Sequence, residues 1–177
     1  MRFVGIDPST KTGLVILDEQ GNVWDKKEIH LKNGIYSSSE ELHEYGIDIV
    51  QSIPSNSVIC IEGFSYGSKG KGVSTQYGVG FSIRFALADV GLKFIEVTPS
   101  QVKKFATGKG NTPKDGMVLP IYRNWGFEDN SDNIRDAFVL AEIARHIRGG
   151  AVGHKYQQEV VQAILEPSKP KKKSKAV

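Results

Sequence analysis

Runs of apolar residues separated by short turn-rich segments predict three strands at the beginning of the chain. They cover residues 2–7, 13–18 and about 22–30, and the stretches DPSTKT and EQGN separate them. Because these connections are short, we expect the strands to pair as antiparallel hairpins. The first strand ends in a carboxylate, Asp7, directly after a continuous apolar run. A charge at that place needs compensation, because an isolated buried ion is costly.

The hydrophobic pattern then changes to strands that alternate with helices. Two further strands are predicted over residues 57–62 and 93–97. Helices are predicted over about 38–53, 75–90, from 98 onward, 114–125 and 132–148. Three antiparallel strands followed by strands that alternate with helices indicate an α/β fold with a five-stranded mixed sheet, three antiparallel strands plus two parallel ones, flanked by helices.

Acidic residues stand at the ends of two predicted strands and at the start of one predicted helix. Glu62 ends its strand as Asp7 ends the first, and neighbouring strands would bring both acids to the sheet edge where ligands bind. Asp132 and Asp136 are four residues apart and therefore share one helix face. Such a cluster repels itself unless a hard cation such as Mg²⁺ or Mn²⁺ binds. Two such ions would activate a water and stabilise the leaving oxygen in phosphodiester cleavage, so the pattern indicates nuclease chemistry.

Three of these acids also have a simpler explanation, whereas Asp136, flanked by Ile134, Ala137 and Phe138, is harder to explain in that way. Asp132 is a candidate helix N-cap, in competition with Asp129 and Ser131. Asp7 could serve only as a turn residue, since Asp favours turns. Glu62 could pair with a lysine. The residues alone leave these alternatives open.

The composition indicates one globular domain followed by a basic tail. The chain has 177 residues, 39% of them hydrophobic, which is enough for one globular domain, predicted over residues 1–166. The last ten residues hold five lysines and no acid, whereas the whole chain carries a net charge of +3, so the rest carries −2. We expect residues 167–177 to form a disordered tail that either holds nucleic acid through its phosphates or only aids solubility.

The same composition excludes several classes of protein. No run approaches the length of a membrane-spanning segment, and we expect a cytoplasmic protein without membrane contact. The single cysteine, Cys60, rules out an internal disulfide and a cysteine-based metal site.

Four blocks of the sequence, in this order, resemble the RuvC-type Holliday junction resolvases of the RNase H-like superfamily, of bacterial or phage type. The blocks are GIDPSTKTG, IEGFSYGSKGKGVSTQYGVG, TPSQVKKFATGKGNTPKD and DNIRDAFVLAEI, and they extend over roughly residues 2–148. The resemblance implies an RNase H-like fold and a Mg²⁺-dependent crossover junction endodeoxyribonuclease with two ions per active site, which Mn²⁺ can replace. It further implies a homodimer that acts on branched DNA, especially four-way junctions, and whose paired nicks leave 5′-phosphate and 3′-hydroxyl ends.

The resemblance also assigns the metal ligands. Asp7, Glu62 and Asp136 match the family's metal-binding acids. Three residues before the last acid the family usually has Asp or His, where this chain has Asn133. An amide oxygen brings no charge, so we expect Asp132 to be the fourth ligand, with Asn133 as the alternative.

DNA contacts are expected on the glycine-rich segment after Glu62 and around residues 103–114. Phe64 is the first candidate for an aromatic residue that stacks on a base at the opened junction, a contact worth ~1–3 kcal/mol, and Tyr66 is the second. Phe64 could instead fold back onto the core. The candidate phosphate contacts are Lys69, Lys71, Lys103, Lys104, Lys109 and Lys114.

Three rival functions are weighed against this one. The sugar kinase, Hsp70 and actin group has a similar first phosphate loop, but it needs two such domains to enclose ATP, and this chain supplies one. Another RNase H-like nuclease, acting on branched DNA generally or on RNA–DNA hybrids, is the nearer alternative. A non-catalytic junction-binding protein is the third, because Asn133 departs from the family's pattern.

Overall fold

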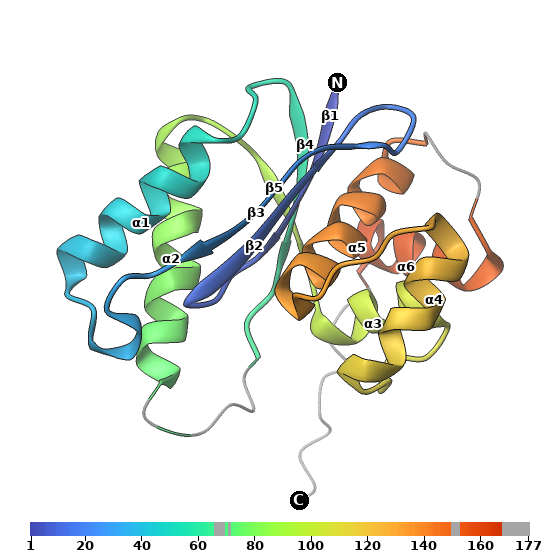
Figure 1. Ribbon diagram of the computed structural model, residues 1–177. Coiled ribbons are helices and arrows are strands. Elements are labelled where there is room, and N and C mark those ends of the chain that lie inside the picture. Colours follow the sequence, from blue (N-terminus) through green and yellow to red (C-terminus); the bar gives the residue numbers. More distant parts are fainter. Residues whose placement is uncertain (66–69, 71, 150–152, 168–177) are drawn as a thin grey trace, which may run out of the picture.

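A single mixed sheet forms the middle of the molecule (Figure 1). The computed structural model describes residues 1–65, 70, 72–149 and 153–167. The strand order is β3-β2-β1-β4-β5, antiparallel between β3, β2 and β1 and parallel between β1, β4 and β5. The strands are β1 (Arg2–Asp7), β2 (Lys11–Leu17), β3 (Val23–His30), β4 (Ser57–Glu62) and β5 (Phe94–Val97). The predicted five-stranded mixed sheet is confirmed.

Helices cover both faces of this sheet (Figure 1). On one face lie α1 (Ser39–Gln51) and α2 (Val73–Asp89), which contact each other and pack on the side chains of Val4, Ile6 and their neighbours. On the other face, α5 packs against β1, β2 and β4. The helices of that layer are α3 (Pro99–Thr107), α4 (Val118–Trp125), α5 (Asp132–Ile147) and α6 (Lys155–Leu165). No described helix is long and apolar enough to cross a membrane.

The structure differs from the predicted elements at three places. Residues Lys114–Met117 form a 3-10 turn before α4, so the helix predicted to start at 114 starts at Val118. A short 3-10 turn, Gly34–Tyr36, precedes α1. The third difference is α6, for which the sequence had predicted no element. Only Gln157 and Val160 of α6 are buried, and this sparse apolar pattern explains why the helix escaped prediction.

Two glycines let α5 lie unusually close to the sheet. A Cβ atom on Gly5 would lie 1.9 Å from the carbonyl oxygen of Ala137, and one on Gly13 would lie 2.1 Å from the carbonyl oxygen of Asn133. Any side chain at either position would therefore push α5 away. Asp7 lies directly opposite Gly13 in the strand register, so the start of α5 is held beside the end of β1.

Candidate active site

Three carboxylates from separate elements line one pocket at the carboxyl ends of the parallel strands. Asp7 ends β1, Glu62 ends β4, and Asp136 comes from the N-terminal half of α5. Side chains alternate along a strand, so the burial of Phe3 and Cys60 in the cluster under α5 puts Asp7 and Glu62 on that same face. The three acids that the sequence predicts at this sheet edge thus line the same pocket.

The environment of these carboxylates disfavours their negative charge. Burial, followed by the nearby charges of Glu62 and Asp136, raises the pKa of Asp7 well above its usual range. Burial and the charge of Asp136 raise the pKa of Glu62 to about 7, although Lys114 and Lys103 oppose the shift. Burial also raises the pKa of Asp136 to about 6. The pocket therefore concentrates negative charge that Lys103 and Lys114 compensate only in part.

The donor set suits a hard divalent cation. Among the described residues, the carboxylates of Asp7, Glu62 and Asp136 accept no hydrogen bond and form no ion pair, which leaves their oxygens available. Oxygen-only ligands of this kind fit Mg²⁺ or Mn²⁺. In the part of the chain that the structure describes, no three His, Cys, Asp or Glu side chains already stand together as a closed metal-binding group. The acids therefore share a pocket without converging on a common point.

Asp132 and Asn133 occupy different surroundings at the start of α5. Asp132 forms an ion pair with Lys114, whose hydrogen bond lowers the pKa of that carboxyl, and it is absent from the pocket lining. Asn133 lines the pocket together with Asp7 and Asp136. The interpretation of Asp132 as helix N-cap is wrong, because the side chain of Ser131 accepts the capping hydrogen bond from the backbone N–H of Ile134 at 3.2 Å.

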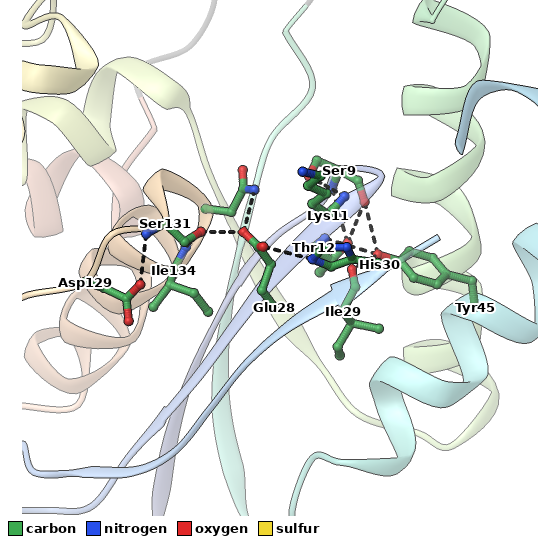
Figure 2. Close-up of polar contacts among 11 residues, drawn as sticks. Ser9, Lys11, Thr12, Glu28, Ile29, His30, Tyr45, Asp129, Ser131 and Ile134 are labelled. Carbon is green, nitrogen blue, oxygen red and sulfur yellow. Dashed lines mark hydrogen bonds and ion pairs between the residues drawn. The ribbon is translucent and has the colours of Figure 1, made fainter. Parts of the chain in front are cut away.

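A glutamate that the sequence analysis missed fixes the start of α5 to the sheet. Glu28 of β3 accepts hydrogen bonds from the hydroxyl of Ser131 and, at 3.1 Å, from Nδ2 of Asn133. Its other oxygen lies 2.9 Å from Nε2 of His30, and Figure 2 shows Glu28 between Ser131 and His30. These bonds lower the pKa of Glu28. No sequence signal marks it, because its meeting with α5 depends on strand register.

A buried arginine, also missed, supports the end of β4. The guanidinium of Arg84 donates to the backbone carbonyls of Glu62 at 3.0 Å and Gly80 at 2.9 Å, and to the carboxylate of Glu96 at 2.6 Å. Its side chain is only 8% exposed. An arginine inside a helix that is otherwise apolar on that face was the available signal.

Phe64 lies against α2 in this structure. Its ring centroid is 5.1 Å from that of Tyr77 and 4.9 Å from that of Phe81, and the guanidinium carbon of Arg84 lies 4.3 Å from its centre. Gly80 makes room for the ring, because a Cβ atom there would lie 2.4 Å from Phe64 Cε1. Phe64 lines the carboxylate pocket while packed in this way.

The predicted phosphate-contacting lysines fall into three groups. Lys103 and Lys114 line the pocket. Lys104 forms an ion pair with Glu159 of α6 at 3.0 Å, and neither it nor Lys109 lines the pocket. The third group, together with the second aromatic candidate and the basic tail, lies outside the described residues: Lys69, Lys71, Tyr66 and residues 168–177.

The amino-acid sequence is similar to those of RuvC proteins from several bacteria. The chain is 29% identical over 154 residues to the crossover junction endodeoxyribonuclease RuvC of Sulfurovum sp., which covers 80% of this chain and 92% of that protein. It is also 29% identical over 152 residues to the RuvC of Helicobacter pylori, with 80% and 94% covered. No protein-family model matches the chain.

Solved structures show the same relationship at the level of fold. The structure of Thermus thermophilus RuvC superposes with a TM-score of 0.61 at 16% identity, over 86% of this chain and 99% of that one. T. thermophilus RuvC in complex with a Holliday junction substrate gives a TM-score of 0.63 at 15% identity, with the same shares covered. The chain has the RNase H-like fold of these proteins, and its resemblance to the RuvC-type resolvases is confirmed in both sequence and fold.

Proposed function

We propose that this protein is a divalent-cation-dependent endonuclease that resolves four-way DNA junctions. The observation that carries the proposal is the pocket of Asp7, Glu62 and Asp136, three carboxylates of raised pKa with free oxygens at the carboxyl ends of β1 and β4. Similarity to RuvC enzymes over 80% of the chain supports the assignment of the substrate, since one solved relative is bound to a Holliday junction.

Asp7, Glu62 and Asp136 are the residues that would hold the cations. A pair of divalent ions, Mg²⁺ or Mn²⁺, would activate the attacking water and stabilise the leaving oxygen. For the fourth ligand, the pocket favours Asn133 over Asp132, because Asn133 lines the pocket and Asp132 is paired with Lys114. The structure thus supports the second of the two choices that the sequence left open.

Two lysines of the pocket would position the DNA. Lys103 and Lys114 lie beside the carboxylates, where a scissile phosphate would otherwise be repelled. Burial opposes the positive charge of Lys114, but the hydrogen bond to Asp132 and the nearby carboxylates raise its pKa, so the amine stays charged. Phe64 lines the same pocket, packed on Tyr77, and is the first candidate to stack on an unpaired base.

Resolution of a four-way junction also requires a second active site. A four-way junction has two like strands related by symmetry, and each must be cut once. The described residues of one chain form a single pocket around Asp7, which can cut one strand. We therefore propose a homodimer in which each subunit makes one nick and leaves a 5′-phosphate and a 3′-hydroxyl. Ends of this kind can be resealed by a DNA ligase.

A cleavage assay with matched DNA substrates tests this function. The purified protein is incubated with a synthetic four-way junction, a three-way junction, a flap and a linear duplex, in Mg²⁺, Mn²⁺ or EDTA. We expect paired nicks in the four-way junction, ligatable products, and no cleavage in EDTA. Cleavage of all branched forms at equal rates would favour general branched-DNA activity, and binding without cleavage in either metal would refute the nuclease.

Variants of single carboxylates complete the assay. Asp7→Asn should abolish cleavage and leave junction binding intact or stronger, because a negative charge near the phosphate is removed. Asp89→Asn is the matched control, since Asp89 is an exposed acid at the end of α2, outside this pocket. A loss of cleavage in both variants would mean that the assay reports general damage rather than the site.

A further inference from the structure

Asp7, Gly13 and Glu28 form a row across the first three strands. Asp7 lies opposite Gly13 in the register of β1 and β2, and Gly13 lies opposite Glu28 in the register of β2 and β3. Residues directly opposite one another in antiparallel strands point to the same face. The two acids thus flank a glycine on the face that α5 covers.

Asn133 sits over the gap that Gly13 leaves. Its backbone carbonyl occupies the space that a Cβ atom on Gly13 would need, only 2.1 Å from that position. Asn133 lines the carboxylate pocket, and its side chain reaches Glu28 through Nδ2 at 3.1 Å. Asn133 therefore connects the acid at the outer strand with the pocket that contains Asp7.

The chemistry of this contact selects one orientation of the Asn133 amide. An ionised carboxylate can only accept hydrogen bonds, whereas an amide has a donating and an accepting end. The donating nitrogen, Nδ2, faces Glu28. The accepting oxygen, Oδ1, therefore points away from Glu28, and this oxygen accepts no hydrogen bond from any described residue. A metal ligand at this position requires the oxygen, because the amide nitrogen does not bind Mg²⁺ or Mn²⁺.

Glu28 is itself held in place by other partners. The hydroxyl of Ser131 donates to the same oxygen that Asn133 contacts, and His30 contacts the other oxygen at 2.9 Å (Figure 2). The Glu28 side chain is 26% exposed, so it is partly shielded from water by this network. The carboxylate thus presents a fixed acceptor to Asn133.

We propose that Glu28 is a positioning residue that keeps Oδ1 of Asn133 turned toward the cation site, so that a neutral amide serves where an acid or histidine would otherwise bind. This inference rests on the proposed metal-dependent function. Residues that orient a metal ligand typically change metal affinity by about 10- to 100-fold when replaced.

The test is a double-mutant cycle read out by Mn²⁺ binding. Mn²⁺ affinity is measured by isothermal titration calorimetry on the full chain, without DNA, for wild type, Glu28→Gln, Asn133→Asp and the double variant. Glu28→Gln keeps the shape of the side chain but can donate as well as accept, so the amide of Asn133 can turn over. We expect an affinity loss of about tenfold in Glu28→Gln.

The Asn133→Asp variant shows whether the effect of Glu28 depends on the orientation of the amide. Both oxygens of the new carboxylate can bind a cation, so no orienting partner is needed. The new carboxylate and Glu28 also repel each other across the same contact, so adding Glu28→Gln should leave the affinity unchanged or raise it. A role of Glu28 that is only structural, for example in holding the start of α5 through Ser131, would instead lower the affinity equally in both backgrounds. That outcome would overturn the proposal.

Two further measurements separate the possible failures. Glu44→Gln is the control, because Glu44 is an exposed glutamate of α1 outside this network, and its Mn²⁺ affinity should match wild type. Urea unfolding of every variant identifies loss of the fold. A wild-type chain that binds no Mn²⁺ would refute the proposed function, whereas wild-type binding that Glu28→Gln leaves unchanged would refute only the role of Glu28.

Discussion

Asp7 and Glu62 end neighbouring parallel strands on the same face of the sheet, and burial together with the charge on Glu62 raises the pKa of Asp7. Both carboxylates line one pocket, and neither accepts a hydrogen bond from a described residue. The fold itself opposes their ionisation, so the pocket should cost stability until a cation or a proton neutralises it.

Replacement of Glu62 by glutamine should stabilise the metal-free protein at alkaline pH. The pKa of Glu62 is about 7 in the fold against an ordinary value of 4.5, so the folded state binds its proton more tightly than the unfolded state does. Stability is therefore lost as pH rises from about 4.5 to about 7 and stays low above that range. Glu62→Gln removes this loss, which is on the order of 3 kcal/mol at pH 8.

Urea unfolding in EDTA at pH 5 and pH 8 measures this effect. Glu44→Gln is the control, because Glu44 is an exposed glutamate of α1 without a hydrogen-bond partner among the described residues. It should leave the difference between the two pH values as it is in wild type. A Glu62→Gln variant that is no more stable than wild type at pH 8 would show that the carboxylate is not under this strain.

Divalent cations should stabilise the wild-type chain and do so more strongly at pH 8 than at pH 6. Protons and cations compete for the same carboxylates, and the pKa values of about 7 for Glu62 and about 6 for Asp136 place that competition in this range. A saturating ion at 100 times its dissociation constant adds about 2.7 kcal/mol. Thermal unfolding with Mn²⁺ should show a rise of several degrees that Asp136→Asn reduces or abolishes.

The order of the elements and the meeting of Asp7, Glu62 and Asp136 could be predicted from the sequence. The reason is physical: apolar runs that end in an acid mark strand ends, and parallel strands bring their carboxyl ends to one edge. The i, i+4 spacing of Asp132 and Asp136 correctly predicts that both lie near one face of the helix. The spacing does not fix which residues of neighbouring elements each side chain contacts. It could not tell that Asp132 meets Lys114 while Asn133 faces the pocket.

The residues that support the site could not be predicted, because their partners lie far away in the sequence. Glu28 reaches α5 only because the register places it opposite Gly13, and register depends on turn geometry that the sequence does not state. Arg84 reaches the end of β4 from the middle of α2, 22 residues away in the chain. Such partners can be found only when the elements have been packed together.

Arg84 should be the most sensitive of these supporting residues. Its guanidinium joins α2 to Glu62 and Glu96, and truncation leaves the carbonyl of Glu62 without that donor. We expect Arg84→Ala to lower the free energy of unfolding by about 2–4 kcal/mol, with Arg84→Lys between it and wild type, because an ammonium cannot bridge the same groups. Urea unfolding measures this, and Arg123→Ala, at an exposed position of α4, should change it by about 0.5 kcal/mol or less. Equal effects of Arg84→Ala and Arg123→Ala would exclude the supporting role.

Lys114 should contribute to DNA binding through its position at the pocket. Lys114→Ala removes one phosphate contact, so junction affinity should fall and the slope of log affinity against log salt should decrease by about 0.9. Lys93→Ala is the matched control. Lys93 is exposed just before the first residue of β5, whereas Glu62 of β4 pairs with Val97 at the last residue of β5. Fluorescence anisotropy with a labelled junction at several salt concentrations measures both variants. If the two lysines change the slope equally, the pocket is not where phosphate binds.

Removal of residues 168–177 should weaken binding to every DNA form by a similar factor. These ten residues hold five lysines and no acid, while the remainder of the chain carries a net charge of −2. Charge of this kind interacts with phosphates without reading the shape of a junction, so the preference for four-way over linear DNA should persist. The salt slope should decrease by up to about 4.5 if all five lysines neutralise phosphates on duplex arms. Anisotropy titrations of the truncated and full chains on both DNA forms measure this, and an unchanged slope would assign the tail to solubility alone.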